Sequence, residues 1–190
     1  MTDGAGGYEA NADAFVAMRS AAGANVARGF ARRLPTGARV LDVGAGFGWP
    51  ITSELVAAGC RVVAIEPAPT LASLLRTALP QVAVRCERAE AAAFRSSELS
   101  GIVMIGVLFL LEAAAQRALL AGLGDALGAD GRLLFSAPWQ AGAWTDVLTG
   151  RPSRSLGATA YEAALSTVGL SLTGRHLDEG GSHYFEAVRS

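Results

Sequence analysis

Two short apolar runs of the chain each end beside residues that could bind a nucleoside. Residues 40–43 include Asp42 and lead into the glycine-rich turn 44–48, and residues 62–65 lead directly to Glu66. Glycine lets a turn adopt positive φ angles and approach a ligand closely, because it has no Cβ. An acid about 20 residues beyond such a turn, at the end of the next strand, can accept hydrogen bonds from ribose hydroxyls. Together the two runs predict a nucleoside site.

The turn does not match a dinucleotide-binding loop. In the pattern G-x-G-x-x-G the last glycine lets the helix pack closely on the strand, but here Gly48 comes one residue early and Trp49 takes the expected place. Asp42 would also lie close to a pyrophosphate and repel it. A nicotinamide-dependent oxidoreductase is disfavoured for these reasons, and because the chain has no lysine for a Ser/Tyr-x-x-x-Lys site. A ligand with a ribose, no phosphate and a positive charge fits better, and S-adenosylmethionine is such a ligand.

The same residues carry a resemblance to a known family. The segment VLDVGAGFG contains the motif (D/E)-x-G-x-G-x-G in full, and VVAIEPAP matches an acidic second motif. In both segments the chain resembles the class I S-adenosylmethionine-dependent methyltransferases, and more narrowly their small, single-domain ubiquinone/menaquinone-methyltransferase-like subgroup. The resemblance covers nearly the whole chain and is specific in its first half. It implies S-adenosyl-L-methionine as cofactor and S-adenosyl-L-homocysteine as product.

The resemblance also implies which residues contact the cofactor. Glu66 would bind the ribose hydroxyls, and segment 88–94 resembles a D-A-E-D-L-P-F stretch that reaches the adenine amino group. Arg88 replaces the aspartate of that stretch and Ala93 its proline, and Glu90 could equally be a solvated charge at a helix start. The implied cofactor contacts are Tyr8, Asp42, Gly44, Ala45, Gly46, Gly48, Glu66, Pro67, Ala89, Glu90, Ile105 and Gly106. For Tyr8 the alternative is a tyrosine that only packs against its helix.

Methyl transfer from a sulfonium needs donor and acceptor held close and aligned in a dry cavity. A general base helps if the acceptor is a hydroxyl or an acidic carbon. His183, at the start of the last strand, is the first candidate for this base, and Glu112, after the fourth strand, is the second. The alternatives are a surface histidine and an acid that starts a helix. The candidate walls of the acceptor pocket are Phe109, Trp139, Trp144 and Tyr184, with core packing as the alternative for the aromatic loop residues.

An α/β fold must position these residues. Helical spacing covers 8–34, strands are predicted at 39–43, 61–65, 82–86, 101–105, 132–136, 171–177 and 183–188, and helices after Pro50 and over 69–78, 113–127 and 159–168. Strands that alternate with helices predict a doubly wound parallel sheet covered on both faces. The hairpin near the end resembles the family's antiparallel last strand, so we expect a mostly parallel, seven-stranded, Rossmann-like sheet. A single methyltransferase domain is expected over 1–190, with a helical lid or cap at 1–34 and the sheet core at 37–190.

Composition excludes several other classes of protein. Apolar residues make up 51% of the 190 residues and charged residues only 17%, which excludes a disordered chain. The apolar run 102–111 is too short to span a bilayer, and a net charge of −1 argues against a nucleic-acid partner. Cys60 and Cys86 have no histidine nearby, so no metal site is expected.

We therefore expect a cytoplasmic enzyme that methylates oxygen, nitrogen or carbon of a small molecule, with neither nucleic acid nor membrane as partner. The alternative is an S-adenosylmethionine-binding protein that has lost catalysis and serves as a sensor or partner subunit. Arg88 and Ser100 keep this alternative open, because they depart from the family's pattern. The sequence leaves the oligomeric state undetermined.

Overall fold

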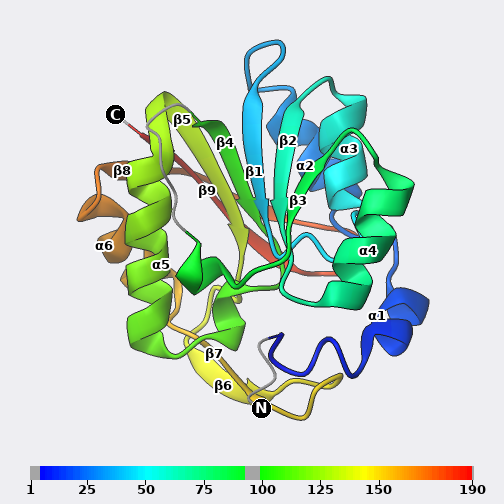
Figure 1. Ribbon diagram of the computed structural model, residues 1–190. Coiled ribbons are helices and arrows are strands. Elements are labelled where there is room, and N and C mark those ends of the chain that lie inside the picture. Colours follow the sequence, from blue (N-terminus) through cyan, green and yellow to red (C-terminus); the bar gives the residue numbers. More distant parts are fainter. Residues whose placement is uncertain (1–4, 93–98, 190) are drawn as a thin grey trace.

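The computed structural model describes residues 5–92 and 99–189 of the chain. The strands of its main sheet are β1 Arg39–Val43, β2 Arg61–Ile65, β3 Ala83–Arg85, β4 Leu99–Met104, β5 Leu127–Ser136, β8 Leu170–Leu177 and β9 His183–Arg189. They lie side by side in the order β3-β2-β1-β4-β5-β9-β8 (Figure 1). Ala93 and Phe94, which belong to the predicted adenine-binding stretch, fall outside the described residues.

The sheet is mostly parallel. β1 pairs in parallel with β2 and with β4, and the pairs β2–β3 and β4–β5 are parallel too. β9 lies between β5 and β8 and runs antiparallel to both. The prediction of a seven-stranded, mostly parallel sheet with an antiparallel last strand is therefore confirmed.

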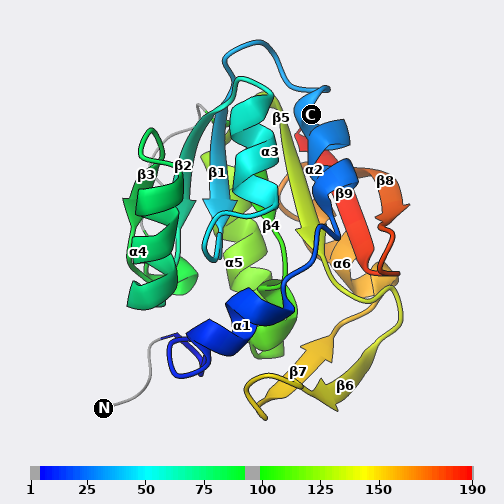
Figure 2. The same cartoon turned by 90° about the vertical axis from the view of Figure 1, so that its right-hand side faces the viewer.

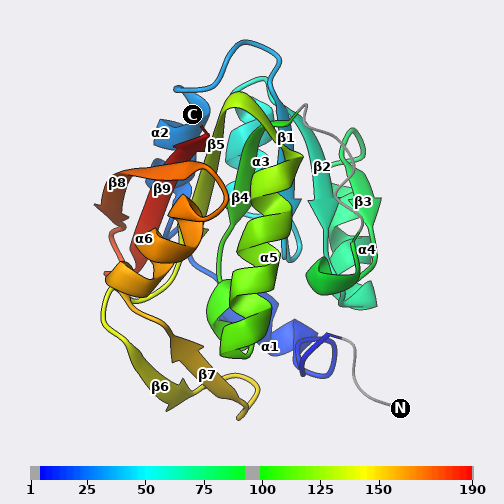
Figure 3. The ribbon, with the colours of Figure 1, turned by 90° about the vertical axis from the view of Figure 1, so that its left-hand side faces the viewer.

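The central strands are apolar on both sides because both faces of the sheet are covered. Successive side chains of a strand point to opposite faces, so Val40 and Val103 pack in one hydrophobic cluster while Leu41 and Ile102 pack in another. The helices over the first cluster are α2 Ala24–Ala31, α3 Ile51–Ala57 and α4 Pro69–Ala78, and those over the second are α5 Ala113–Ala126 and α6 Ala158–Ser166. Figure 2 shows the first group in front of the sheet, and Figure 3 shows the second.

The helical spacing over residues 8–34 corresponds to two helices with a break between them. The structure has α1 Ala12–Met18, then a break, then α2. Gly23 caps α2 with a φ of 87°, and a Cβ at this position would lie 2.7 Å from the hydroxyl oxygen of Tyr184. The helical pattern hides the break because Ala21 and Ala22 are themselves good helix formers.

A second small sheet forms where the sequence predicts only a Trp-bearing loop. β6 Gly142–Thr145 and β7 Pro152–Ser155 make an antiparallel hairpin. At its base the Gln116 amide donates to the carbonyl oxygen of Arg154 over 3.0 Å, and the Tyr161 hydroxyl donates to Gln116 Oε1 over 2.7 Å. All residues of β6 are exposed, so the strand lacks the alternation of apolar and polar residues that would identify it.

The hairpin and the N-terminal segment together cover the carboxyl ends of the parallel strands (Figure 1). The two segments lie against each other at Gly7 and Thr149. A Cβ added to Gly7 would lie only 3.0 Å from the Cβ of Thr149 in the hairpin loop. Within 5–92 and 99–189, no helix combines the length and the apolar character needed to cross a membrane.

Candidate functional site

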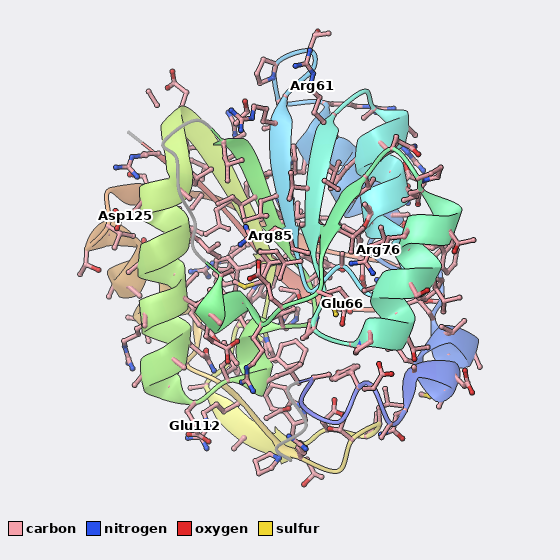
Figure 4. All side chains as sticks on the ribbon, viewed as in Figure 1. Arg61, Glu66, Arg76, Arg85, Glu112 and Asp125 are labelled. Atoms are coloured by element: carbon pink, nitrogen blue, oxygen red, sulfur yellow. The ribbon has the colours of Figure 1, made fainter. Side chains whose placement is uncertain are left out.

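A cavity of about 320 Å³ lies at the carboxyl ends of β1, β2 and β4. Sheets of this type bind their ligands at this edge. The glycine turn after β1, the residues after β2 and the loop after β4 form one side of the cavity, and residues 5–19 and the β6–β7 loop form the other. Its wall includes Glu66, which Figure 4 labels at the lower ends of the strands.

The glycine turn has a conformation that other residues would strain. Gly44, Gly46 and Gly48 have φ angles of 71°, 59° and 90°. A Cβ on Gly44 would lie 2.1 Å from a methyl carbon of Val107, which is an impossible contact. Gly44 and Gly46 line the cavity together with Ala45, whereas Gly48 does not. Gly48 instead faces Leu75 of α4, so its implied contact with a cofactor is replaced by a packing contact.

Glu66 links the glycine turn to the end of β2. Its side chain is buried, and its carboxylate accepts hydrogen bonds from the backbone N–H groups of Gly46 and Ala68, both over 2.8 Å. Burial raises the pKa of Glu66, although the two backbone donors act to lower it. Each carboxylate oxygen has two lone pairs, so the side chain retains acceptor capacity toward the cavity.

Asp42 is the second buried acid of the cavity. Thr52, in the first turn of α3, donates its hydroxyl to Asp42 Oδ2 over 2.6 Å. Burial raises the pKa of Asp42 to about 7, while the Thr52 hydrogen bond lowers it and the charge of Glu66 raises it further. The two buried carboxylates of the site therefore have different hydrogen-bond donors: a hydroxyl for Asp42 and two backbone N–H groups for Glu66.

The residues after β2 and β3 form one end of the cavity. Pro67, Leu71 and Ala89 line it there, and Glu90 lies beside them. Glu90 is ion-paired with Arg88 over 2.7 Å. Although burial acts to raise the pKa of Glu90, its hydrogen bond with Arg88 holds this pKa below the usual value.

The loop after β4 forms the middle of the cavity. Ile105 and Gly106 line it, and the Gly106 N–H donates to the Ser136 hydroxyl over 2.8 Å, which fixes the loop to the end of β5. The next residues on the wall are apolar: Val107, Phe109, Leu110 and Leu111.

Tyr8 comes from the N-terminal segment and also lines the cavity. Its ring packs edge-on against Phe15, with 5.6 Å between the ring centroids. Burial, followed by the charges of Asp146 and Glu66, raises the pKa of Tyr8 to about 12. The Tyr8 hydroxyl therefore stays protonated near neutral pH and can donate a hydrogen bond.

His183, the first candidate base, does not line the cavity. Its Nδ1 accepts a hydrogen bond from the Trp139 backbone N–H over 3.0 Å, and the two rings stack with centroids 4.2 Å apart. Trp139 is likewise outside the cavity wall and packs against the hydrophobic core. The expected pocket roles of both residues find no support in this arrangement, because each binds the other.

The remaining candidates also lie away from the cavity, apart from Phe109. Glu112 precedes α5 and pairs with Arg154 over 3.0 Å, so it is an acid at a helix start (Figure 4). Tyr184 is buried beside α2, where its hydroxyl donates to Asp178 over 2.7 Å. Trp144 lies on β6 with its ring centroid 5.5 Å from that of Phe109, and it supports the wall from outside.

Arg19 is a charged residue of the cavity wall that the sequence interpretation missed. It directly follows α1, and its side chain lines the cavity. The helical spacing over 8–34 does not show where the first helix ends, so it gave no reason to single out this position. The one available signal is an arginine that follows an otherwise apolar helical stretch.

Several solved structures have the same fold. The 1,6-didemethyltoxoflavin-N1-methyltransferase of Burkholderia thailandensis, with bound 1,6-didemethyltoxoflavin and S-adenosylhomocysteine, superposes with a TM-score of 0.76 at 19% identity and covers 94% of this chain and 83% of its own. An S-adenosylmethionine-bound amino pentose methyltransferase of Micromonospora echinaspora has a TM-score of 0.73 at 20% identity, with 96% of each chain covered. The magnesium protoporphyrin IX methyltransferase of Synechocystis PCC 6803, also with bound S-adenosylmethionine, has a TM-score of 0.67 at 19% identity and covers 97% and 80%.

Sequence comparison identifies the family. Over 58 residues the chain is 48% identical to an uncharacterized methyltransferase of Mycobacterium tuberculosis (strain ATCC 25618 / H37Rv), a match that covers 30% of this chain and only 24% of the relative. Residues 15–178 match a family model described as a methyltransferase domain. These findings do not distinguish the ubiquinone/menaquinone-methyltransferase-like subgroup from others. Because the family model covers most of its length, the chain belongs to the methyltransferase domain family.

Proposed function

We propose that the protein transfers a methyl group from S-adenosylmethionine to a small-molecule acceptor by in-line displacement. The observation that carries this proposal is Glu66, a buried carboxylate that two backbone N–H groups hold at the wall of the cavity, beside the glycine turn. An acid at this position suits the two hydroxyls of an unphosphorylated ribose. The cavity volume of about 320 Å³ falls at the lower end of the usual range for small-molecule sites.

The other residues of the cavity fit the remaining parts of this cofactor. Pro67, Leu71 and Ala89 provide apolar surface for an adenine, and Gly44 and Gly106 provide backbone for the methionine chain. Asp42 places a carboxylate at the same end as the glycine turn, where a ligand with ammonium and sulfonium groups is favoured over a pyrophosphate.

The cofactor supplies a methyl group that is activated by the positive charge on sulfur. In the transfer, an acceptor lone pair forms the new bond to carbon, the electron pair of the broken bond stays on sulfur, and any proton on the acceptor atom leaves. The apolar residues Phe109 and Leu110 exclude water from the acceptor side of the cavity, which favours a reaction that neutralises charge. Tyr8 positions polar groups as a hydrogen-bond donor and cannot serve as a base while it is protonated.

A small molecule is the acceptor class that the solved neighbours support. Two of them are named for small substrates, 1,6-didemethyltoxoflavin and magnesium protoporphyrin IX. The proposal also includes four further points. The acceptor atom is oxygen, nitrogen or carbon, and the protein belongs to the ubiquinone/menaquinone-methyltransferase-like subgroup. It has a single domain over residues 1–190 and a cytoplasmic location.

One observation favours the alternative of a cofactor-binding sensor or partner subunit. The two acid–base candidates, His183 and Glu112, both have other partners and lie off the cavity wall. An acceptor that needs proton removal would then depend on another group.

Calorimetry tests the proposal directly. S-adenosylhomocysteine should bind to the wild-type protein, and NAD should not bind at the same concentrations. Binding of NAD without S-adenosylhomocysteine would exclude the proposed cofactor. Methyl transfer from labelled S-adenosylmethionine to panels of phenols, amines and carboxylic acids then separates an enzyme from a sensor.

A further inference from the structure

The β6–β7 loop brings an acid to the cavity wall. Among residues 5–92 and 99–189, four carboxylates line the cavity: Asp42, Glu66, Glu90 and Asp146. Asp42 and Glu66 lie at the carboxyl ends of β1 and β2, and Glu90 is ion-paired with Arg88. Asp146 comes from the opposite side of the cavity, where the hairpin covers the strands.

The loop holds the Asp146 side chain in a defined orientation. The backbone N–H and the hydroxyl of Thr149 both donate to Asp146 Oδ1 over 2.7 Å. The Asp146 backbone is also fixed, because its N–H donates to the carbonyl oxygen of Arg151 and its carbonyl oxygen accepts from the Gly150 N–H, both over 2.8 Å. The second carboxylate oxygen, Oδ2, accepts none of the hydrogen bonds that the described residues make. The loop therefore fixes the side chain through one oxygen and leaves the other for a ligand.

The surroundings of Asp146 combine a polar group with an apolar wall. After burial, the charge of Asp146 is the next cause that raises the pKa of Tyr8 to about 12, so this charge acts inside the cavity. Phe109 and Leu110 line the same cavity, and the Phe109 ring packs against Trp144 of the hairpin with 5.5 Å between the ring centroids. An apolar molecule with one polar substituent fits these surroundings.

We propose that Asp146 is a catalytic residue, which accepts the N–H or O–H of the methyl acceptor on Oδ2 and removes its proton. The inference rests on the proposed function and narrows its acceptors to amines and hydroxyl compounds. An ionised carboxylate can only accept hydrogen bonds, so it favours a donor and repels another carboxylate. Arg151 also lines the cavity, but its guanidinium lies against the N-terminal segment, where a Cβ on Gly7 would be 3.4 Å from Arg151 Nε.

This role supplies the group that His183 and Glu112 do not provide at the cavity wall. A general base must lie within hydrogen-bond reach of the proton that it removes. As the acceptor lone pair forms its bond to the methyl carbon, the electron pair of the broken bond returns to sulfur and the acceptor proton passes to Asp146 Oδ2. Solvent water then takes this proton and restores the carboxylate.

Three small aromatic probes test which acceptors the site binds. At neutral pH 4-fluorophenol and 4-fluoroaniline are uncharged and carry a hydrogen-bond donor, whereas 4-fluorobenzoate is an anion without one. Fluorine NMR with protein saturated with S-adenosylhomocysteine measures all three affinities. The two donors should bind to the wild type about 10-fold more tightly than 4-fluorobenzoate, and Asp146→Asn should remove this preference.

Transfer from labelled S-adenosylmethionine to the two donor probes tests the proton removal. Asp146→Asn keeps an oxygen for the Thr149 donors but cannot take a proton, so transfer should slow about 100- to 10,000-fold. Its affinity for S-adenosylhomocysteine, measured by calorimetry, should equal that of the wild type, which also shows that the variant is folded. The matched control is Asp125→Asn on the exposed face of α5 (Figure 4), which should change none of these values.

The possible failures are distinguishable. Tighter binding of 4-fluorobenzoate to the wild type would overturn the inference and favour a carboxylate acceptor held by Arg151. Transfer that Asp146→Asn leaves unchanged would overturn it too, as would a wild type that binds S-adenosylhomocysteine but methylates neither donor probe. Loss of S-adenosylhomocysteine binding in Asp146→Asn would make Asp146 structural and contradict the catalytic role. If the wild type itself does not bind S-adenosylhomocysteine, the proposed function fails.

Discussion

Asp42 and Glu66 show how neighbouring residues of one type acquire different properties. Both are buried carboxylates on one cavity, and the charge of Glu66 raises the pKa of Asp42. Glu66 accepts two backbone N–H groups that would otherwise be buried without a partner, so removing it affects the turn as well as the ligand. Asp42 accepts one hydroxyl, and burial raises its pKa to about 7.

Glu66→Ala should weaken S-adenosylhomocysteine binding by about 1–3 kcal/mol, because charge-assisted hydrogen bonds to the ribose are lost. Calorimetry measures the change. The matched control is Glu162→Ala, since Glu162 lies on α6 and contacts Arg175 only at 3.9 Å near the surface. An affinity that Glu66→Ala leaves unchanged would exclude the ribose role.

The cofactor-free protein should become less stable between pH 6 and pH 8 because of Asp42. An aspartate in an unfolded chain ionises near pH 4, whereas burial raises the pKa of Asp42 to about 7. The folded state binds the extra proton below pH 7, and this stabilisation is lost as the pH rises through 7. The contribution of Asp42 to the unfolding free energy should fall by about 1 kcal/mol from pH 6 to pH 8.

Urea unfolding of wild type and Asp42→Asn at both pH values isolates this contribution, because asparagine does not titrate and all other groups are shared. The stability of the variant relative to wild type should rise by the same amount. Equal pH dependence in the two proteins would place the Asp42 pKa outside this window.

At the scale of elements, the sequence predicts best those strands that are buried on both faces of the sheet. β1, β2 and β4 are apolar because helices cover both faces of the sheet, and their apolar runs identify them directly. The break between α1 and α2 and the exposed hairpin β6–β7 escape prediction, since neither changes the apolar pattern. Arg19 and the hairpin contribution to the cavity are missed for this reason, while the glycine turn and Glu66 are found.

Gly23→Ala should destabilise the protein by more than the backbone strain of an alanine at positive φ, because the new methyl group would also clash with Tyr184. The new Cβ would lie 2.7 Å from Tyr184 Oη at a φ of 87°. Gly59 has nearly the same φ, 84°, with nothing within 4 Å of its added Cβ, so Gly59→Ala measures the backbone strain alone. We expect about 1 kcal/mol for Gly59→Ala and about 1–3 kcal/mol more for Gly23→Ala in urea unfolding. Equal costs would show that Tyr184 moves aside freely.

At the scale of the whole molecule, Glu186 joins elements from both ends of the chain. Its buried carboxylate on β9 accepts hydrogen bonds from Arg33 over 2.9 and 2.6 Å, and from Arg132 on β5 over 3.1 Å. His176 on β8 contacts it over 2.8 Å. Although burial acts to raise the pKa of Glu186, Arg33 and His176 hold it below the usual value.

Glu186→Gln should lower the unfolding free energy by about 2–3 kcal/mol at pH 7, because it leaves the partly solvated guanidinium groups of Arg33 and Arg132 without their carboxylate. The lowered pKa stabilises the folded state above the unfolded value near 4.5, and this stabilisation is lost as the pH falls through the lower folded value. The cost of the substitution, measured by urea unfolding, should therefore shrink toward pH 3. Glu162→Gln serves as the surface control and should cost almost nothing.

The separation of the two sheets has a consequence for the evolution of the proposed acceptor site. Within the described part of the chain, β6 and β7 pair only with each other, and their base is fixed to the core by Gln116 and Tyr161. Insertions or substitutions in the tip between them leave the register of the seven-stranded sheet and the glycine turn untouched. The tip can therefore diversify as a replaceable module, and new acceptor preferences can arise while the half of the cavity beneath β1 and β2 stays the same.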